Sequence, residues 1–155
     1  MPSLDQPVKT PCIGVCSTGI GDLVCRGCKR FVHEVVDWNG YRTEQKRIVD
    51  RRLSRFLAQC MGNYFEVVDE NLLRQQLALQ LIRYDDSHEP LCWVFALLKA
   101  GAGQIKNTRA FGFEVRSDYK SSALKVLRDT VDDEYFQLSK AHYERYFLGG
   151  MSSER

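Results

Sequence analysis

The sequence lacks the long apolar runs that a membrane-spanning helix requires. No run reaches the ~18 residues of such a helix, and the first ten residues carry Asp5 and Pro7 where a signal peptide has an apolar core. We therefore expect a cytoplasmic protein without membrane contact. Internal repeats and low-complexity tracts are also missing, so the 155 residues suit one domain, or a small module attached to a modest one.

Recognisable catalytic motifs are absent as well. The segment Gly101–Lys106 lacks the spacing of a phosphate-binding loop. The polar turn around His88 has no nucleophile at a recognisable spacing. We therefore expect a protein that is not an enzyme. A site built from residues distant in sequence leaves no such pattern, so the question of an enzyme stays open.

Cysteine, in contrast, is plentiful and clustered. The chain has 6 cysteines, and disulfides are rare in the cytoplasm, where clustered cysteines are more typical of metal sites. Two chelating pairs that are close in sequence come together at little cost in loop entropy, and Gly27 suits a positive φ in the tight turn of the second pair. The predicted metal ligands are Cys12, Cys16, Cys25 and Cys28.

The remaining candidate ligands have simpler interpretations. Cys60 and Cys92 are isolated in apolar stretches, and we expect them to be buried as small apolar side chains. His33 follows Cys28 by five residues, but four cysteines already complete a closed site. We expect His33 to be a partly exposed helical residue.

The spacing of the cysteines leans to zinc, but it leaves the metal open between zinc and an iron–sulfur cluster. Common zinc ribbons separate their cysteine pairs by ~15–20 residues, whereas this sequence places eight residues between Cys16 and Cys25. The C-x2-C-x2-C run of ferredoxins is missing. Charge does not decide, because tetrathiolate zinc and an oxidised four-iron cluster both carry −2. Residues 1–60 hold 10 Lys and Arg against 6 Asp and Glu, an excess of positive charge that suits either centre.

The cysteine motif also resembles a known family. Thr10-Pro11-Cys12-Ile-Gly-Val-Cys16 and Cys25-Arg-Gly-Cys28-Lys-Arg30, followed by Glu34 and Trp38, are similar to the short bacterial proteins called YdhL-like. That family is a domain of unknown function, often described as predicted Fe–S proteins, and the resemblance covers about residues 10–55. It implies that the four cysteines are ligands, and its name favours iron–sulfur. From the residues themselves, we expect Trp38 to pack over the cysteine loop, and Glu34 to pair with Arg30 or to support the site.

The hydrophobic pattern predicts an α+β fold that is mainly α-helical, with a few short strands. Tail residues 1–10 are expected to be disordered, residues 11–61 to form the metal-binding module with two helices, and residues 62–155 to form a helix-rich domain. Expected helices cover residues 29–38, 44–61 with Thr43 as N-cap, 69–81 with Asp69 as N-cap, and 91–100, where a strand is the alternative. Strands are expected at 63–68 and 109–116, and a long helical region from Ser121 or Ser122, which Thr130 divides if it caps a second helix.

Three functions are consistent with these features. The first is a non-enzymatic metal-binding accessory protein that acts with a protein partner. The second is an iron–sulfur protein for electron transfer or redox sensing. The third is a nucleic-acid-binding accessory protein that uses the basic face of helix 44–61. The candidate nucleic-acid contacts are Arg47, Arg51, Arg52 and Arg55.

Overall fold

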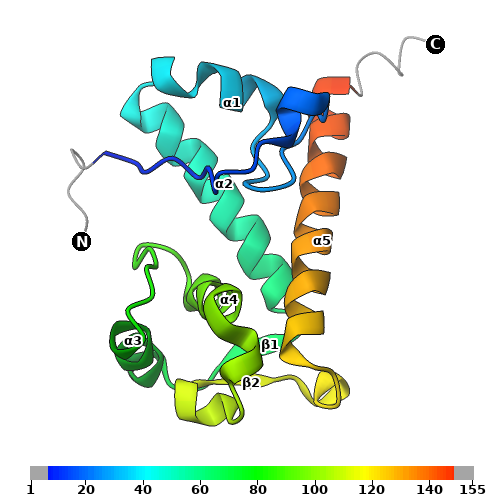
Figure 1. Cartoon of the computed structure of the whole chain (residues 1–155). Helices are drawn as coiled ribbons and strands as arrows, with labels where there is room; N and C mark the ends of the chain where they lie inside the picture. The colour runs from blue at the N-terminus through cyan, green and yellow to red at the C-terminus, as the bar shows by residue number, and fades with distance from the viewer. Residues whose placement is uncertain (1–6, 149–155) are drawn as a thin grey trace. The chain divides into compact units, whose positions relative to one another are not determined.

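A computed structural model describes residues 7–148 of the chain (Figure 1). Residues 7–10 have no regular secondary structure, and the rest of the expected tail lies outside the described residues. The fold is mainly α-helical with two short antiparallel strands, which confirms the predicted class. No helix among the described residues is long and apolar enough to cross a membrane.

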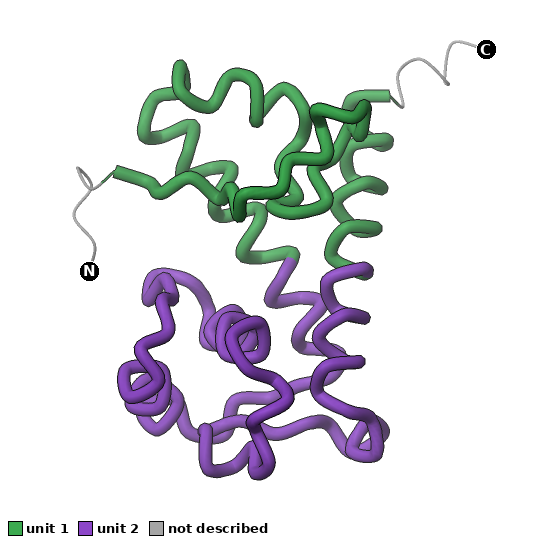
Figure 2. Tube along the Cα trace, in the orientation of Figure 1, with its two compact units in different colours: residues 1–56, 134–155 green, residues 57–133 purple. Residues whose placement is uncertain are grey.

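The chain divides into two compact units (Figure 2). Unit 1 contains residues 1–56 and 134–155, and unit 2 contains residues 57–133. Helices α2 (Thr43–Met61) and α5 (Leu124–Tyr143) each contribute residues to both units. The predicted domains instead divide the chain once, between residues 61 and 62. That division into domains stays a prediction.

Unit 1 contains the cysteine segment, the short helix α1 (Val32–Asp37) and a 3-10 turn at Trp38–Gly40. Glu34 caps the start of helix α1, because its Oε1 accepts the backbone N–H of Phe31 at 2.8 Å. Helix α2 begins at Thr43, so the cap position falls one residue earlier than predicted, on Arg42. The Arg42 N–H donates to Gln45 Oε1.

Unit 2 contains helices α3 (Glu70–Leu79) and α4 (Pro90–Gly101) and the strands β1 (Phe65–Val67) and β2 (Phe113–Val115). Asp69 caps α3 as predicted, accepting the Leu72 N–H at 3.0 Å. The two strands pair antiparallel, with Phe65 opposite Val115. The segment expected as a helix over 91–100, with a strand as the alternative, is helix α4. Pro90 at its first position suits a helix start.

Two later element boundaries also differ from the predictions. The strand expected over 109–116 covers only β2, because Asn107 caps a 3-10 turn at Thr108–Phe111 and Gly112 follows with φ 84°. The helical region does not divide at Thr130. Its hydroxyl donates to the Val126 carbonyl one turn earlier at 2.8 Å, so it sits inside one continuous helix, α5.

Candidate metal centre

The second cysteine pair lies on the turn of a short hairpin. Val24 forms an antiparallel bridge with Phe31, and the Cys25 N–H donates to the Arg30 carbonyl at 2.9 Å. The chain reverses at Lys29, which has φ 65° and donates its backbone N–H to the Cys25 carbonyl at 2.8 Å. The positive φ predicted for Gly27 therefore occurs at Lys29, a residue for which that conformation is uncommon.

The first cysteine pair lies on a loop that turns at Gly14. This glycine has φ 92°, and its N–H points at the sulfur of Cys12, with nitrogen and sulfur 3.4 Å apart. A 3-10 turn at Ser17–Ile20 follows Cys16, and Gly21, with φ 102°, returns the chain toward the hairpin. Backbone N–H groups that face a ligating sulfur are a usual feature around metal sites.

The two cysteine loops are packed directly against each other. A Cβ atom on Gly27 would lie 2.6 Å from the Val15 carbonyl oxygen and 3.0 Å from the Ile13 side chain. The Cys25 sulfur lies 3.5 Å from the same Val15 oxygen. Gly27 is therefore needed for close approach of the loops, which is a different reason from the one predicted.

Ser17 ties the two loops together from the other side of Cys16. Its hydroxyl accepts the backbone N–H of Arg26 at 2.8 Å, and the residue is buried. Val15 and Ser17 flank Cys16, and both contact Cys25 or its neighbour Arg26. The backbone at Cys16 is thus held against the backbone at Cys25.

The four sulfurs differ in their surroundings. Cys25 and Cys28 are 1% and 7% exposed. Cys12 and Cys16 are exposed, and the Cys16 sulfur lies 2.9 Å from the Thr18 hydroxyl. Across residues 7–148, no three cysteine sulfurs lie within 4.8 Å of one another. The structure therefore brings the two loops together, with one pair of cysteines buried and the other exposed.

The two buried thiols have opposite pKa shifts. Burial by itself raises the pKa of Cys25, but hydrogen bonds from the backbone of Cys28, Ser17 and Gly27 and from the Cys28 side chain outweigh it, and the pKa falls to about 7. Burial raises the pKa of Cys28, against the opposing effect of the Arg30 guanidinium. The hydrogen bonds around Cys25 favour a thiolate, which is the form that binds metals.

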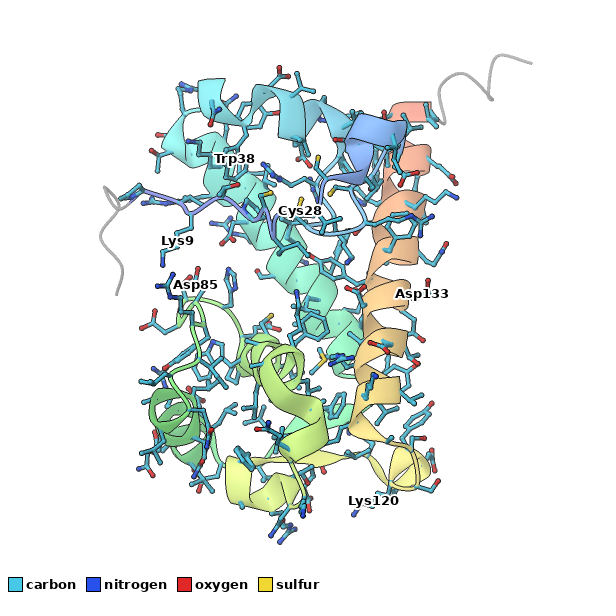
Figure 3. All side chains as sticks on the ribbon, in the orientation of Figure 1. Lys9, Cys28, Trp38, Asp85, Lys120 and Asp133 are labelled. Carbon is cyan, nitrogen blue, oxygen red and sulfur yellow. The ribbon has the colours of Figure 1, made fainter. Side chains whose placement is uncertain are left out.

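Two buried cations lie beside the sulfurs. Lys29 is 1% exposed, and its ammonium donates to the carbonyls of Arg26 and Gly27 at 2.6 and 3.2 Å. Arg30 is 4% exposed and donates from Nε to the Cys28 sulfur at 3.2 Å. The Arg30 guanidinium also stacks on the ring of Trp38, with 4.9 Å to the ring centroid. Figure 3 labels Cys28 and Trp38 among the side chains of unit 1.

Glu34 forms its ion pair with Arg52 of helix α2, and not with Arg30 as predicted. Both guanidinium N–H groups donate to the carboxylate at 2.6 Å. The Arg52 guanidinium also lies over the ring of Phe31, 3.9 Å from its centroid. Helix α2 is thereby fixed to the hairpin and to α1.

The C-terminal part of α5 lies beside the cysteine segment (Figure 1) and supports the hairpin through aromatic side chains. Val24, Phe31 and Phe136 form a buried cluster, against which Tyr143 packs. The guanidinium of Arg26 stacks on Phe136 at 4.5 Å. His33 is half-buried on α1, as predicted, and lies 4.9 Å from the Phe147 ring.

At least one arginine of the predicted basic face of α2 has a partner within the protein. Arg52 is occupied by Glu34 and Phe31. Arg51 and Arg55 are exposed and Arg47 is half-exposed. Nucleic-acid contact by these three residues stays a prediction.

Sequence reasoning missed three residues that organise the site: Ser17, Lys29 and Arg52 as the partner of Glu34. The polar Ser17 directly after a cysteine gave a weak signal, because hydroxyl groups commonly accept turn N–H groups. Burial of Lys29 and the pairing of Arg52 depend on contacts between segments distant in sequence. Cys60 and Cys92 are buried, as predicted for small apolar side chains.

Comparison with known proteins found a match for the cysteine segment alone. Residues 10–56 match a family model described as "Protein of unknown function (DUF1289)". This range agrees with the resemblance seen at about residues 10–55, and it covers less than a third of the chain. Neither the curated proteins nor the solved structures gave a match.

Proposed function

We propose that this chain is a non-enzymatic accessory protein whose N-terminal module is stabilised by a metal centre on Cys12, Cys16, Cys25 and Cys28. The observation that carries the proposal is the packing of the two cysteine loops onto each other at Gly27 and Val15. Such contact is what two chelating pairs need in order to share one centre. The N–H groups directed at the Cys25 sulfur fit a ligating thiolate.

Charge at the site also fits a four-thiolate centre. Four thiolates around a core of charge +2 carry −2 together. Lys29 and Arg30 are buried beside the loops, and a nearby negative charge favours the charged form of a buried cation. A negative centre at the four cysteines would offset both cations.

A four-cysteine ligand set favours a structural role. Structural sites are closed by four protein ligands, whereas catalytic zinc sites keep one position open for water or substrate. When bound, the metal cross-links two segments that have little regular secondary structure of their own. The binding free energy then becomes folding free energy of the module.

Exposed apolar side chains on the cysteine segment support a protein partner. Ile13, Val15, Ile20 and Leu23 are all exposed, with Ile20 at 86%. Apolar groups that a protein leaves in water mark interaction sites when they gather on one surface. We propose that the metal centre holds this segment in shape for a partner.

The proposal is tested by the fluorescence of Trp38, which lies in the module. The chain has 2 tryptophans, so Trp93→Phe leaves Trp38 as the only one. We expect a strong chelator to change the Trp38 emission and to expose unit 1 to protease. Cys60→Ser, combined with Trp93→Phe, is the matched control and should respond to chelator in the same way. An emission and protease pattern that chelator and Cys25→Ser both leave unchanged would contradict the proposal.

A further inference from the structure

Lys29 is a buried lysine at the turn of the cysteine hairpin, and its ammonium contacts the backbone of that turn. The residue is 1% exposed, and a lysine is almost never fully buried unless it is paired. Its ammonium donates to the carbonyls of Arg26 and Gly27 at 2.6 and 3.2 Å. These are the residues that separate Cys25 from Cys28. The buried charge therefore acts on the backbone between the two cysteines of this pair.

The two carbonyls belong to the peptide groups that carry the N–H of Gly27 and the N–H of Cys28. A peptide group is planar and trans, so its C=O and its N–H point in opposite directions. An ammonium that holds both carbonyls on one side therefore directs both N–H groups to the other side. Those same N–H groups hydrogen-bond to the sulfur of Cys25. Successive N–H groups that converge on one point form a binding site for negative charge.

The backbone conformation at position 29 does not explain why the residue is a lysine. Its φ is 65°, a value that glycine adopts at no steric cost and that lysine rarely adopts. The N–H of Lys29 donates to the Cys25 carbonyl at 2.8 Å, a bond that a glycine could also make. Glycine would form the same turn with less backbone strain, so the ammonium is what the lysine adds.

Resting on the proposed function, we propose that Lys29 is a positioning residue for the metal centre. Its ammonium acts on Cys25 through the two peptide groups of the turn. It fixes their orientation, and its charge polarises them so that their N–H groups become stronger donors. These N–H groups then stabilise the Cys25 thiolate as a ligand, whichever metal the site holds. Arg30 differs in that it donates directly to the Cys28 sulfur.

Binding of cadmium-113 to the metal-free full chain tests this role, because spin coupling between cadmium and an amide proton passes through an N–H···S hydrogen bond. In the wild type we expect couplings to the amide protons of Gly27 and Cys28. Lys29→Met keeps the length of the side chain and removes its charge. This variant should lose the couplings and bind cadmium about 10–100-fold more weakly. Lys29→Arg should recover part of both, and Lys125→Met, which removes an exposed lysine of α5, is the matched control.

Lys29→Gly separates the effect of the ammonium from that of the backbone. This variant relieves the positive φ, so a purely conformational role predicts cadmium binding at least as tight as in the wild type. We expect weaker binding instead, by a factor similar to that of Lys29→Met. Wild-type affinity in both variants would overturn the inference and leave the proposed metal-binding function intact.

The wild-type couplings need no variant, so they test the inference even where a variant fails to fold. A cadmium-loaded wild type without couplings at Gly27 and Cys28 would overturn the role of Lys29 alone. A folded wild-type chain that binds no cadmium would overturn both the inference and the proposed function.

Discussion

The Nε atom of Arg30 lies 3.2 Å from the sulfur of Cys28, while the same guanidinium stacks on Trp38. This one side chain therefore connects a ligand of the proposed metal to the apolar packing behind it. The resemblance to a cysteine-rich family placed Arg30 and Trp38 together as motif residues. Their contact gives a physical reason for both.

Replacement of Arg30 should weaken metal binding more than it weakens the fold. We expect Arg30→Gln to lower metal affinity about 10–100-fold, since groups that hydrogen-bond to ligands typically contribute that much. Competition with a chromogenic chelator measures the change. Arg51→Gln removes an exposed cation from α2 and is the matched control. Equal affinities of the two variants would show that Arg30 does not support the site.

Gly27→Ala should separate the two cysteine loops. Its Cβ would lie 2.6 Å from the Val15 carbonyl oxygen, so the backbone must shift, at a cost of about 1–3 kcal/mol. We expect a lower melting temperature and weaker metal binding. In Gly19→Ala the added Cβ meets nothing within 4 Å, and this variant should behave like the wild type. The loop contact is unimportant if both glycine variants bind and melt alike.

Loss of the Glu34 carboxylate charge should destabilise unit 1 strongly. Glu34→Gln leaves Arg52 without its bidentate partner in a largely buried position, and breaking such a pair costs about 3 kcal/mol. Urea denaturation measures the free energy of unfolding. Glu70→Gln breaks the exposed pair with Arg74 and should cost less than about 1 kcal/mol. Similar losses in both variants would argue against the Glu34–Arg52 pair.

His142 should make stability depend on pH in the mildly acidic range. Burial lowers its pKa, the Arg52 and Arg145 charges lower it further, and Glu34 opposes them. Below the ordinary histidine pKa of about 6.5, the unfolded chain then binds more protons than the folded chain. Stability should therefore fall as the pH falls from about 6.5 through the folded-state pKa. Above about pH 6.5, His142 should add no pH dependence. His142→Phe should reduce this slope in thermal melts between pH 7.5 and 5.5. Parallel slopes for the two proteins would remove His142 from this account.

Thiol labelling should follow the burial of the cysteines. In the folded, metal-free chain we expect an alkylating agent to modify Cys12 and Cys16 first, because both are exposed, while Cys60 and Cys92 stay protected. Added zinc should protect Cys12 and Cys16 as well. Mass spectrometry of peptides identifies the labelled sites. Labelling of Cys12 and Cys16 that zinc does not slow would contradict their role as ligands.

Elements with strong local signals could be predicted from the sequence. The polar cap at Asp69 and the apolar stripe through Leu73 and Leu77 define α3 without help from the rest of the chain. The beginning of β2 could not be predicted, because Gly112 packs against the start of α3. A Cβ on Gly112 would lie 2.3 Å from the Asp69 carbonyl oxygen. This contact joins segments more than forty residues apart.

The candidate site also contains features that the sequence predicts and features that it does not. The spacing of the four cysteines is a local pattern, and it identified the two loops that the structure packs together. The partner of Glu34 was predicted from helical spacing as Arg30, but the carboxylate pairs with Arg52, which is 18 residues away in sequence. The burial of Lys29 likewise depends on the hairpin and on Tyr135 of α5, whose ring its ammonium faces at 5.3 Å. Such contacts leave no periodic pattern.

The most direct test of the central claim is native mass spectrometry of the full chain and its single cysteine variants. The account predicts one bound metal centre per chain in the wild type and in Cys60→Ser and Cys92→Ser. It predicts loss or severe weakening of that binding in Cys12→Ser, Cys16→Ser, Cys25→Ser and Cys28→Ser. Metal retained at full strength without Cys25, or lost without Cys60, would contradict the four-cysteine centre.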